Sequence, residues 1–168
     1  MAIAVNDANI FIDLFEIDLI DTFFKIKLNL HTTNLVMNEL DFEQKLVLEK
    51  HVKSKKLTVK VLNEIELDEL KAKEIASNRL TKPDISVYAY AKELNATILT
   101  SDGRLRREAK EKGFDVHGIL WVFEKLIEEK LIKPSKASEK LTELMKINTW
   151  LPMDECRKRI EKWNTKKT

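Results

Sequence analysis

The sequence predicts an α/β fold in which helices cover both faces of a mostly parallel central sheet. Short apolar segments that are typical of buried strands alternate along the chain with segments of helical periodicity. Only three Gly and three Pro occur in 168 residues, a composition that favours helices joined by short connections. The length and a hydrophobic fraction of 43% suit one domain with a sizeable core.

The predicted strands are short, apolar and rich in β-branched residues. They cover residues 2–6, 27–31, 57–62, 97–101 and 114–117. Because the strands alternate with helices, we expect them to run parallel and to end at one common edge of the sheet.

Apolar residues at helical spacing predict helices between these strands. The predicted helices cover residues 8–17, 19–24, 33–40, 42–53, 65–79, 85–94 and 103–112. Thr33 is a suitable N-cap, and Thr81-Lys82-Pro83-Asp84 combines a capping residue, a Pro in the first turn and an acid three residues after the Thr. In the helix over 42–53 we expect Phe42, Leu46 and Val47 on the apolar face.

The C-terminal third of the chain is predicted to be helical. Two apolar stripes run through it, from Ile119 to Ile127 and from Ala137 to Met145. We expect Trp150 and Trp163 to pack these last helices back onto the core.

The net charge of +2 is distributed unevenly. Residues 7–21 hold five acids and no cation, residues 104–112 hold five cations and two acids, and residues 157–168 hold six cations and one acid. An acidic centre with basic flanks would suit a metal-dependent site acting on a polyanion. A solvated, frayed terminus explains the last basic run equally well.

Several other classes of protein leave no trace in the sequence. Cys156 is the only cysteine, which excludes an internal disulfide and fits a reducing compartment. No apolar run reaches the roughly 18 residues of a membrane span, and residues 1–15 lack the features of a signal peptide, so we expect a cytoplasmic protein. The three histidines lack zinc-ligand spacing, and there is neither a Gly-rich phosphate loop nor a GxSxG motif.

Four acids are expected to converge on one edge of the sheet. Asp7 and Asp102 each follow a predicted strand, so both belong at its carboxyl edge. Asp84 begins a helix of roughly 16 Å, and the strand that follows runs back by roughly 20 Å, which returns the chain to that edge. Glu39 lies less than two turns into the helix after the second strand, near the same edge if its face points inward.

Each acid also has a simple structural explanation. Asp7 and Asp102 suit helix N-caps, Asp84 suits a helix dipole, and Glu39 suits a solvated surface. Four carboxylates at one edge would nevertheless repel one another unless a cation joined them. Hard divalent ions with oxygen ligands, Mg²⁺ or Mn²⁺, are the natural candidates, and they support in-line attack of water on a phosphodiester.

Four segments resemble the acidic motifs of the PIN-domain family. They are VNDANIFIDL, the Glu in VMNEL, KPDISVYAYA and ILTSDGRLRREAKEKG. The order of the four acids, their spacing and the apolar residues around them match the motifs of that family. The resemblance covers residues 1–118, and residues 119–168 look like the helical extension of some toxin-like prokaryotic PIN proteins. It implies a three-layer α/β/α sandwich, with a PIN-like nuclease domain over 1–118 and a helical extension over 119–168 packed on the same domain.

The resemblance also implies a metal-dependent endoribonuclease that hydrolyses RNA phosphodiester bonds and leaves 5′-phosphate and 3′-hydroxyl ends. Asp7, Glu39, Asp84 and Asp102 would be its catalytic acids and would hold Mg²⁺ or Mn²⁺. Many small family members are toxins of toxin–antitoxin pairs, similar to the VapC type, so we expect that role here.

Five further residues flank these acids. Asn9 and Ser101 match polar positions of the family and either orient water or a ligand or make local turn and cap hydrogen bonds. Three arginines of the 103–112 helix either contact the RNA backbone or form a solvated face; they are Arg104, Arg106 and Arg107.

Two other functions remain open from the sequence. One is a PIN-like module that binds nucleic acid or protein without cleavage, and the other is an RNA-processing nuclease outside toxin–antitoxin systems. The expected partners are an RNA substrate, an antitoxin protein and a second copy of the chain, with no membrane. The exposed sides of the helices over 8–24 and 42–53 are the expected protein contacts.

Overall fold

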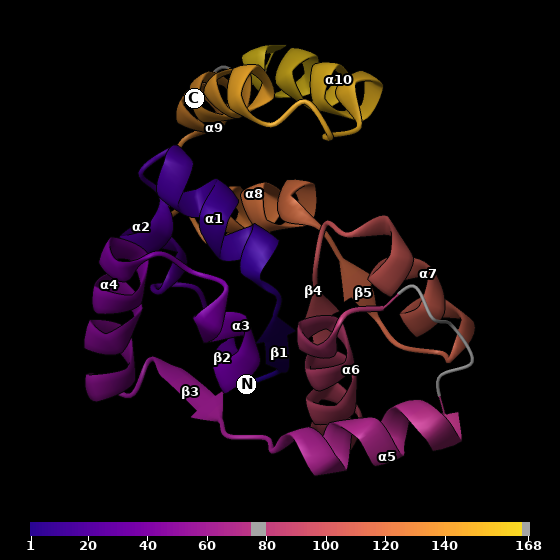
Figure 1. Ribbon diagram of the computed structural model, residues 1–168. Helices are drawn as coiled ribbons and strands as arrows, with labels where there is room; N and C mark the ends of the chain where they lie inside the picture. The colour runs from indigo at the N-terminus through magenta and orange to yellow at the C-terminus, as the bar shows by residue number, and fades with distance from the viewer. Residues whose placement is uncertain (75–79, 166–168) are drawn as a thin grey trace.

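The computed structural model of the protein describes residues 1–74 and 80–165 (Figure 1). Within these residues the strands form one parallel sheet in the order β3-β2-β1-β4-β5. The strands are β1 Ile3–Asn6, β2 Asn29–Thr33, β3 Leu57–Lys60, β4 Thr97–Leu99 and β5 Val116–His117. From β1 the chain adds strands first on one side of the sheet, β2 and β3, and then on the other, β4 and β5, so β1 pairs with both β2 and β4. Ligands bind at such points in open α/β sheets.

Helices cover both faces of the sheet and give the three-layer α/β/α arrangement that the sequence predicts (Figure 1). They are α1 Ala8–Glu16, α2 Ile20–Phe23, α3 Asn34–Asn38, α4 Phe42–Lys53, α5 Glu64–Glu74, α6 Lys82–Leu94, α7 Gly103–Glu111, α8 Ile119–Glu128, α9 Pro134–Ile147 and α10 Met153–Thr165. Helix α6 packs along β1, β2 and β4 and also contacts α3, α5 and α7. Helix α2 contacts both α1 and α8.

The last two helices form a pair beyond α1 and α8 (Figure 1). Helices α9 and α10 contact each other closely, and α9 also contacts α1 and α8. Trp163 is buried and its ring lies 5.8 Å from that of Phe123 in α8, which confirms the expected core role of this tryptophan.

Local sequence explains where the helices near the carboxyl edge begin. The Thr33 hydroxyl accepts a hydrogen bond from the Val36 N–H and caps α3. At the start of α6, Thr81 and Asp84 form a capping box in which each side chain accepts from the other residue's N–H. These caps fix the N-termini of α3 and α6 beside the ends of β1 and β2.

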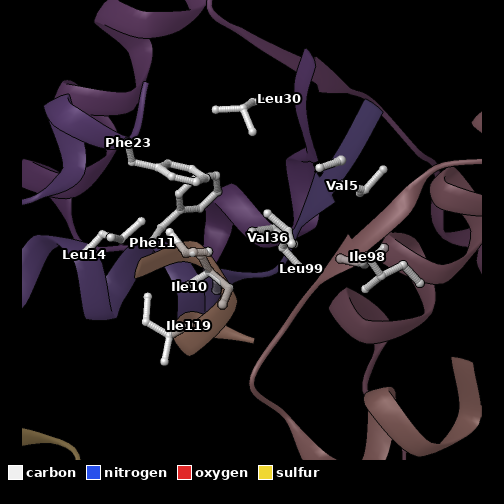
Figure 2. Packing of buried hydrophobic residues seen from close by; sticks show 14 of the residues in the cluster. Val5, Ile10, Phe11, Leu14, Phe23, Leu30, Val36, Ile98, Leu99 and Ile119 are labelled. Atoms are coloured by element: carbon white, nitrogen blue, oxygen red, sulfur yellow. The ribbon is translucent and has the colours of Figure 1, made fainter. Parts of the chain in front are cut away.

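The core lies between the sheet and the helices that cover it. Figure 2 shows Phe11, Leu14 and Phe23 of α1 and α2 gathered on one side of the sheet, close to Val36 and Ile119. All five side chains are buried. Because apolar burial supplies most of the stability of such a domain, this packing holds the strand ends in fixed positions.

Most predicted elements are confirmed within one or two residues at each boundary. The second strand begins later than expected, at Asn29, because the Lys27 N–H donates to a Glu129 carboxylate oxygen (2.8 Å) and not to a neighbouring strand. The helix predicted over 65–79 is present as α5, and residues 75–79 lie outside the described part of the chain.

The packing predictions for α4 and Trp150 need correction. In α4 Val47 packs against the core as predicted and Leu48 is fully buried, whereas Phe42 is 74% exposed and Leu46 is also exposed, because α4 lies beside β3 at the margin of the sheet. Trp150 is 95% exposed and does not pack into the core, because it lies in the connection between α9 and α10.

Among residues 1–74 and 80–165, no helix combines the length and the apolar character needed to cross a membrane.

Candidate metal-binding site at the carboxyl edge of the sheet

The ends of β1 and β4 bring two aspartates together. Asp7 directly follows β1 and is the N-cap of α1, and Asp102 lies just beyond β4 and is the N-cap of α7. The Asp7 N–H donates to the Leu99 carbonyl of β4 (2.9 Å), so the two strand ends are joined at this point. Both aspartates therefore lie at the carboxyl edge, where the strand order reverses.

Two helices bring the other two acids to the same edge. Asp84 is the third residue of α6, and Glu39 immediately follows α3. The Thr33 and Ser86 hydroxyls are 2.7 Å apart, which ties the beginning of α3 to the first turns of α6.

The charges of the four acids act on one another. Burial raises the pKa of Asp7 to about 6; the hydrogen bond from Thr100 opposes this rise, and the charges of Asp84 and Asp102 add to it. Burial also raises the pKa of Asp84, against the hydrogen bonds from Thr81.

Glu39 shows the same coupling from a more open position. Partial burial and then the charges of Asp7, Asp84 and Asp102 raise its pKa to about 7, although much of the residue remains in contact with solvent. The four acids thus lie close enough for the charges of the other three to act on Glu39.

Asp7 is held by a network that the sequence only partly revealed. Its Oδ2 accepts hydrogen bonds from the Thr100 hydroxyl (2.7 Å) and the Asn9 amide (3.0 Å), and its Oδ1 accepts one from the Ala8 N–H (2.8 Å). The Thr100 hydroxyl in turn accepts from the Asp102 N–H (3.1 Å) and so links the two aspartates. Thr100 was missed because a Thr at the end of an apolar run resembles an ordinary strand residue.

Asn9 and Ser101 lie beside this network. Asn9 Oδ1 accepts from the Ser101 N–H (2.9 Å), so the Asn9 side chain joins α1 to the turn after β4. Two buried polar atoms near the acids, Asn6 Oδ1 and Ser101 Oγ, find no hydrogen-bond partner in the described parts of the chain. Buried polar atoms are usually paired, and these two are exceptions.

The three arginines of α7 have different surroundings. Arg104 and Arg107 are exposed, and the charge of Arg104 partly opposes the rise in the pKa of Asp84. Arg106 is half-buried and lines a cleft that begins at Asp102.

The chemistry of the acid cluster fits a hard divalent cation. Each donor is a carboxylate oxygen, the ligand type that Mg²⁺ and Mn²⁺ prefer, and a cation would relieve the repulsion that adds to the effect of burial on the pKa of Asp7 and Glu39. Within residues 1–74 and 80–165, no three His, Cys, Asp or Glu side chains already form an assembled metal-binding group. The four acids are therefore a cluster of suitable donors and not a completed coordination sphere.

Comparison with known proteins identifies the class of this α/β protein. A family model described as a PIN domain matches residues 3–165, and the chain therefore belongs to the PIN-domain family. This places it in a superfamily of nucleases that typically use divalent metal ions and bind nucleic acid. The expected family membership is confirmed.

Among solved structures, the protein is similar to a PilT N-terminus domain protein, SSO1118, from the hyperthermophilic archaeon Sulfolobus solfataricus P2. The TM-score is 0.45 at 16% sequence identity, and the match covers 71% of this chain and 89% of that chain. No curated protein matches the sequence.

Proposed function

We propose that the protein is a metal-dependent endoribonuclease that hydrolyses RNA phosphodiester bonds with Mg²⁺ or Mn²⁺. The observation that carries this proposal is the convergence of four carboxylates on the carboxyl edge of the sheet; they are Asp7, Glu39, Asp84 and Asp102. The charges of Asp84 and Asp102 add to the raised pKa of Asp7 and of Glu39, and like charges held this close are costly to keep ionised together near neutral pH. A divalent cation compensates that cost and is also the cofactor class of PIN nucleases.

In this proposal the chain's own residues hold and orient the ion's ligands. Hydrogen bonds from Thr100 and Asn9 fix the Asp7 carboxylate, and the capping bond from the Thr81 N–H fixes Asp84 (2.9 Å). Asp102 Oδ1 accepts from the Arg104 and Leu105 N–H groups (2.9 and 3.0 Å).

Each anchoring bond immobilises a carboxylate before substrate arrives, which is the kind of preorganisation that makes electrostatic catalysis effective. When bound, a divalent ion neutralises phosphate charge and lowers the pKa of water. Glu39, the most exposed of the four acids, completes the donor set.

We further propose that this nuclease is the toxin of a toxin–antitoxin pair. The exposed Phe42 and Leu46 on α4 support a protein contact there, because large apolar side chains one turn apart on a helix surface favour a docking partner. A small upstream reading frame that encodes a DNA-binding protein would support the toxin role. Its absence would favour an RNA-processing nuclease.

The decisive experiment is cleavage of single-stranded RNA by purified protein with Mg²⁺, Mn²⁺ or EDTA. We expect metal-dependent cleavage by the wild type and none by Asp7→Asn or Asp102→Asn, because each substitution removes one negative ligand. If the wild type and both variants cleave equally, the activity belongs to a contaminant or another site, and the proposal fails.

A further inference from the structure

A cleft of about 840 Å³ opens directly beside the acid cluster. Asn9, Ser101 and Asp102 line it on the side of the sheet edge. Trp150 and Arg159 line it from the connection after α9 and from α10. The last helices of the chain therefore build one wall of a cavity whose other wall is the candidate metal site.

Hydrogen bonds anchor the backbone of Trp150 beside this cleft. Its N–H donates to Asn148 Oδ1 (3.0 Å), and the Asn148 amide donates to Asp13 in α1 (3.0 Å). The next residue, Leu151, is buried. Because its neighbours on both sides are anchored, the backbone of Trp150 is fixed at the edge of the cleft, and its indole is 95% exposed.

The second tryptophan of the cleft already has aromatic and cationic neighbours. Trp121 stacks on the His117 ring with centroids 4.5 Å apart and planes at 7°, and Lys125 Nζ lies 5.5 Å from the Trp121 ring centre. Trp150 is thus the tryptophan with an open face, and an open indole face is suited to stacking on a flat ligand.

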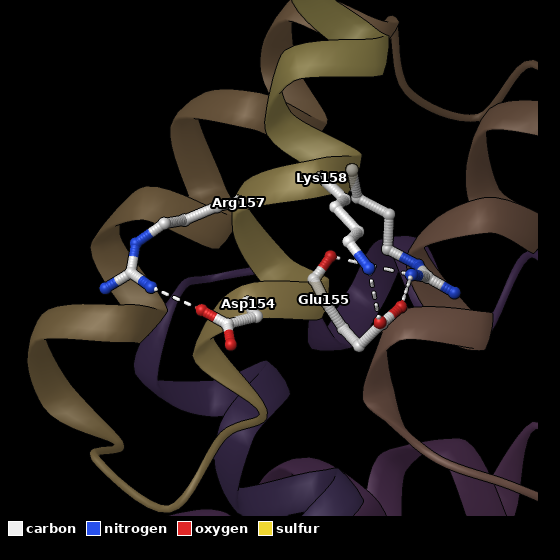
Figure 3. Close-up of polar contacts among 5 residues, drawn as sticks. Asp154, Glu155, Arg157 and Lys158 are labelled. Carbon is white, nitrogen blue, oxygen red and sulfur yellow. Dashed lines mark hydrogen bonds and ion pairs between the residues drawn. The ribbon is translucent and has the colours of Figure 1, made fainter.

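The cations of the cleft also differ. Arg159 pairs with Glu124 (3.1 Å) and Glu155 (2.9 Å), and Figure 3 shows that Glu155 also pairs with Lys158 along α10. Arg106 has no ion-pair partner within the described residues. Its guanidinium is the positive charge of the cleft that stays available to an anion.

Gly118 makes room for that guanidinium. A Cβ at residue 118 would lie 2.5 Å from Arg106 Nη1 and 3.6 Å from Ser101 Oγ. Arg106 and Ser101 are thus neighbours of Gly118 in the lining of the cleft, which also includes Asp102. The Arg106 guanidinium offers charge-assisted hydrogen bonds to a phosphate oxygen.

We propose that this cleft binds a nucleotide of single-stranded RNA next to the scissile phosphate, with its base stacked on Trp150 and its phosphate bound by Arg106. The inference rests on the proposed nuclease function and adds a subsite to it. A single strand is required because the base must leave its neighbours to cover the indole, and stacking of this kind tolerates any base. The C-terminal helices thereby take part in substrate binding.

Binding measured without cleavage tests the subsite directly. The probe is a short fluorescein-labelled RNA containing all four bases, titrated with protein in EDTA and followed by anisotropy. We expect Trp150→Ala to weaken binding roughly 10-fold or more and Trp150→Phe to retain most of the affinity. Phe42→Ala is the matched control, because it removes another exposed aromatic ring outside the cleft.

The phosphate contact has its own variant and control. Arg106→Gln should weaken binding and lower the slope of log affinity against log salt by about one. Lys110→Gln removes one exposed charge from the same helix, outside the cleft, and should have a smaller effect. Equal effects of the two substitutions would contradict a specific role for Arg106.

Cleavage kinetics separate failure of this inference from failure of the proposed function. If the wild type shows no metal-dependent cleavage, the nuclease proposal fails. If it cleaves RNA and Trp150→Ala behaves like Phe42→Ala in affinity and KM, the subsite is wrong and the nuclease stands. The expected result is a raised KM with little change in kcat for Trp150→Ala, and no dependence on Trp150 with the same RNA in duplex form.

Discussion

Burial raises the pKa of two aspartates of the α1 region, Asp7 at its N-cap and Asp13 within the helix, but their neighbours differ. Asp7 is 3% exposed and Asp13 is 5% exposed, and burial raises the pKa of each to about 6. Around Asp7 the further rise comes from the carboxylates Asp84 and Asp102. Around Asp13 the main neighbour is the Asn148 amide, which donates to both carboxylate oxygens (3.0 and 3.3 Å) and opposes the rise, and the charge of a single acid, Glu16, adds to it.

The difference shows that a raised pKa alone does not mark a functional site. Asp13 finds its partner within the chain and fastens α1 to the end of α9, so its role is structural. Asp7 is surrounded by other acids at the edge where the strand order reverses, and hydrogen bonds alone do not remove that repulsion. The number of carboxylates that converge is the more informative feature.

The largest expected effect that tests this comparison is on RNA cleavage. Asp7→Asn should lower the metal-dependent rate at least about 100-fold, the scale of losing one preorganised electrostatic group. Asp13→Asn should keep the wild-type rate, because an amide at this position still accepts from Asn148. Rates are measured with both variants at equal folded concentration, checked by circular dichroism. Similar losses in the two variants would remove the distinction between the sites.

The positions of three of the four acids could be predicted from the sequence because chain geometry fixes them, whereas that of Glu39 depended on which way its helix face points. Asp7 and Asp102 follow apolar strand segments, and Asp84 stands in a capping motif whose helix and following strand nearly cancel in length. Their assignment as metal ligands, and the division of the chain at residue 118, stay predictions.

Other features could not be predicted because they depend on contacts between distant residues. Asp13 belongs to the same acidic run as Asp7, and its partner Asn148 lies 135 residues away. Thr100 resembles an ordinary strand residue in the sequence, and only the structure shows that its hydroxyl donates a hydrogen bond to Asp7. Trp150 was expected in the core because Trp is usually well buried. The local sequence pattern does not indicate that the connection after α9 leaves this side chain exposed.

The second expected effect is on stabilisation by metal. A divalent ion that binds only the folded state raises the free energy of unfolding by about 2.7 kcal/mol at a concentration 100 times its dissociation constant. We expect Mn²⁺ to raise the Tm of the wild type and of Asp13→Asn by the same amount, and that of Asp7→Asn by much less. Differential scanning calorimetry with Mn²⁺ and with EDTA measures this. A gain that Asp13→Asn loses and Asp7→Asn keeps would reverse the assignment.

The third expected effect, of the same order as the second, is on the pH dependence of stability in EDTA. The pKa of Asp13 rises from 3.8 in the unfolded chain to about 6 in the fold, so the folded state binds the proton more tightly. Its contribution is fully present below about pH 4 and is lost as pH rises through about 6, which lowers the unfolding free energy by at most about 3 kcal/mol. Urea unfolding from about pH 4 to about pH 7 should therefore show a fall in the wild type that is smaller in Asp13→Asn and, by the same reasoning, in Asp7→Asn. Mn²⁺ should then restore at neutral pH the part of the fall that belongs to Asp7 and leave the part that belongs to Asp13, because the proposed ion binds among the acids around Asp7 and not at Asp13.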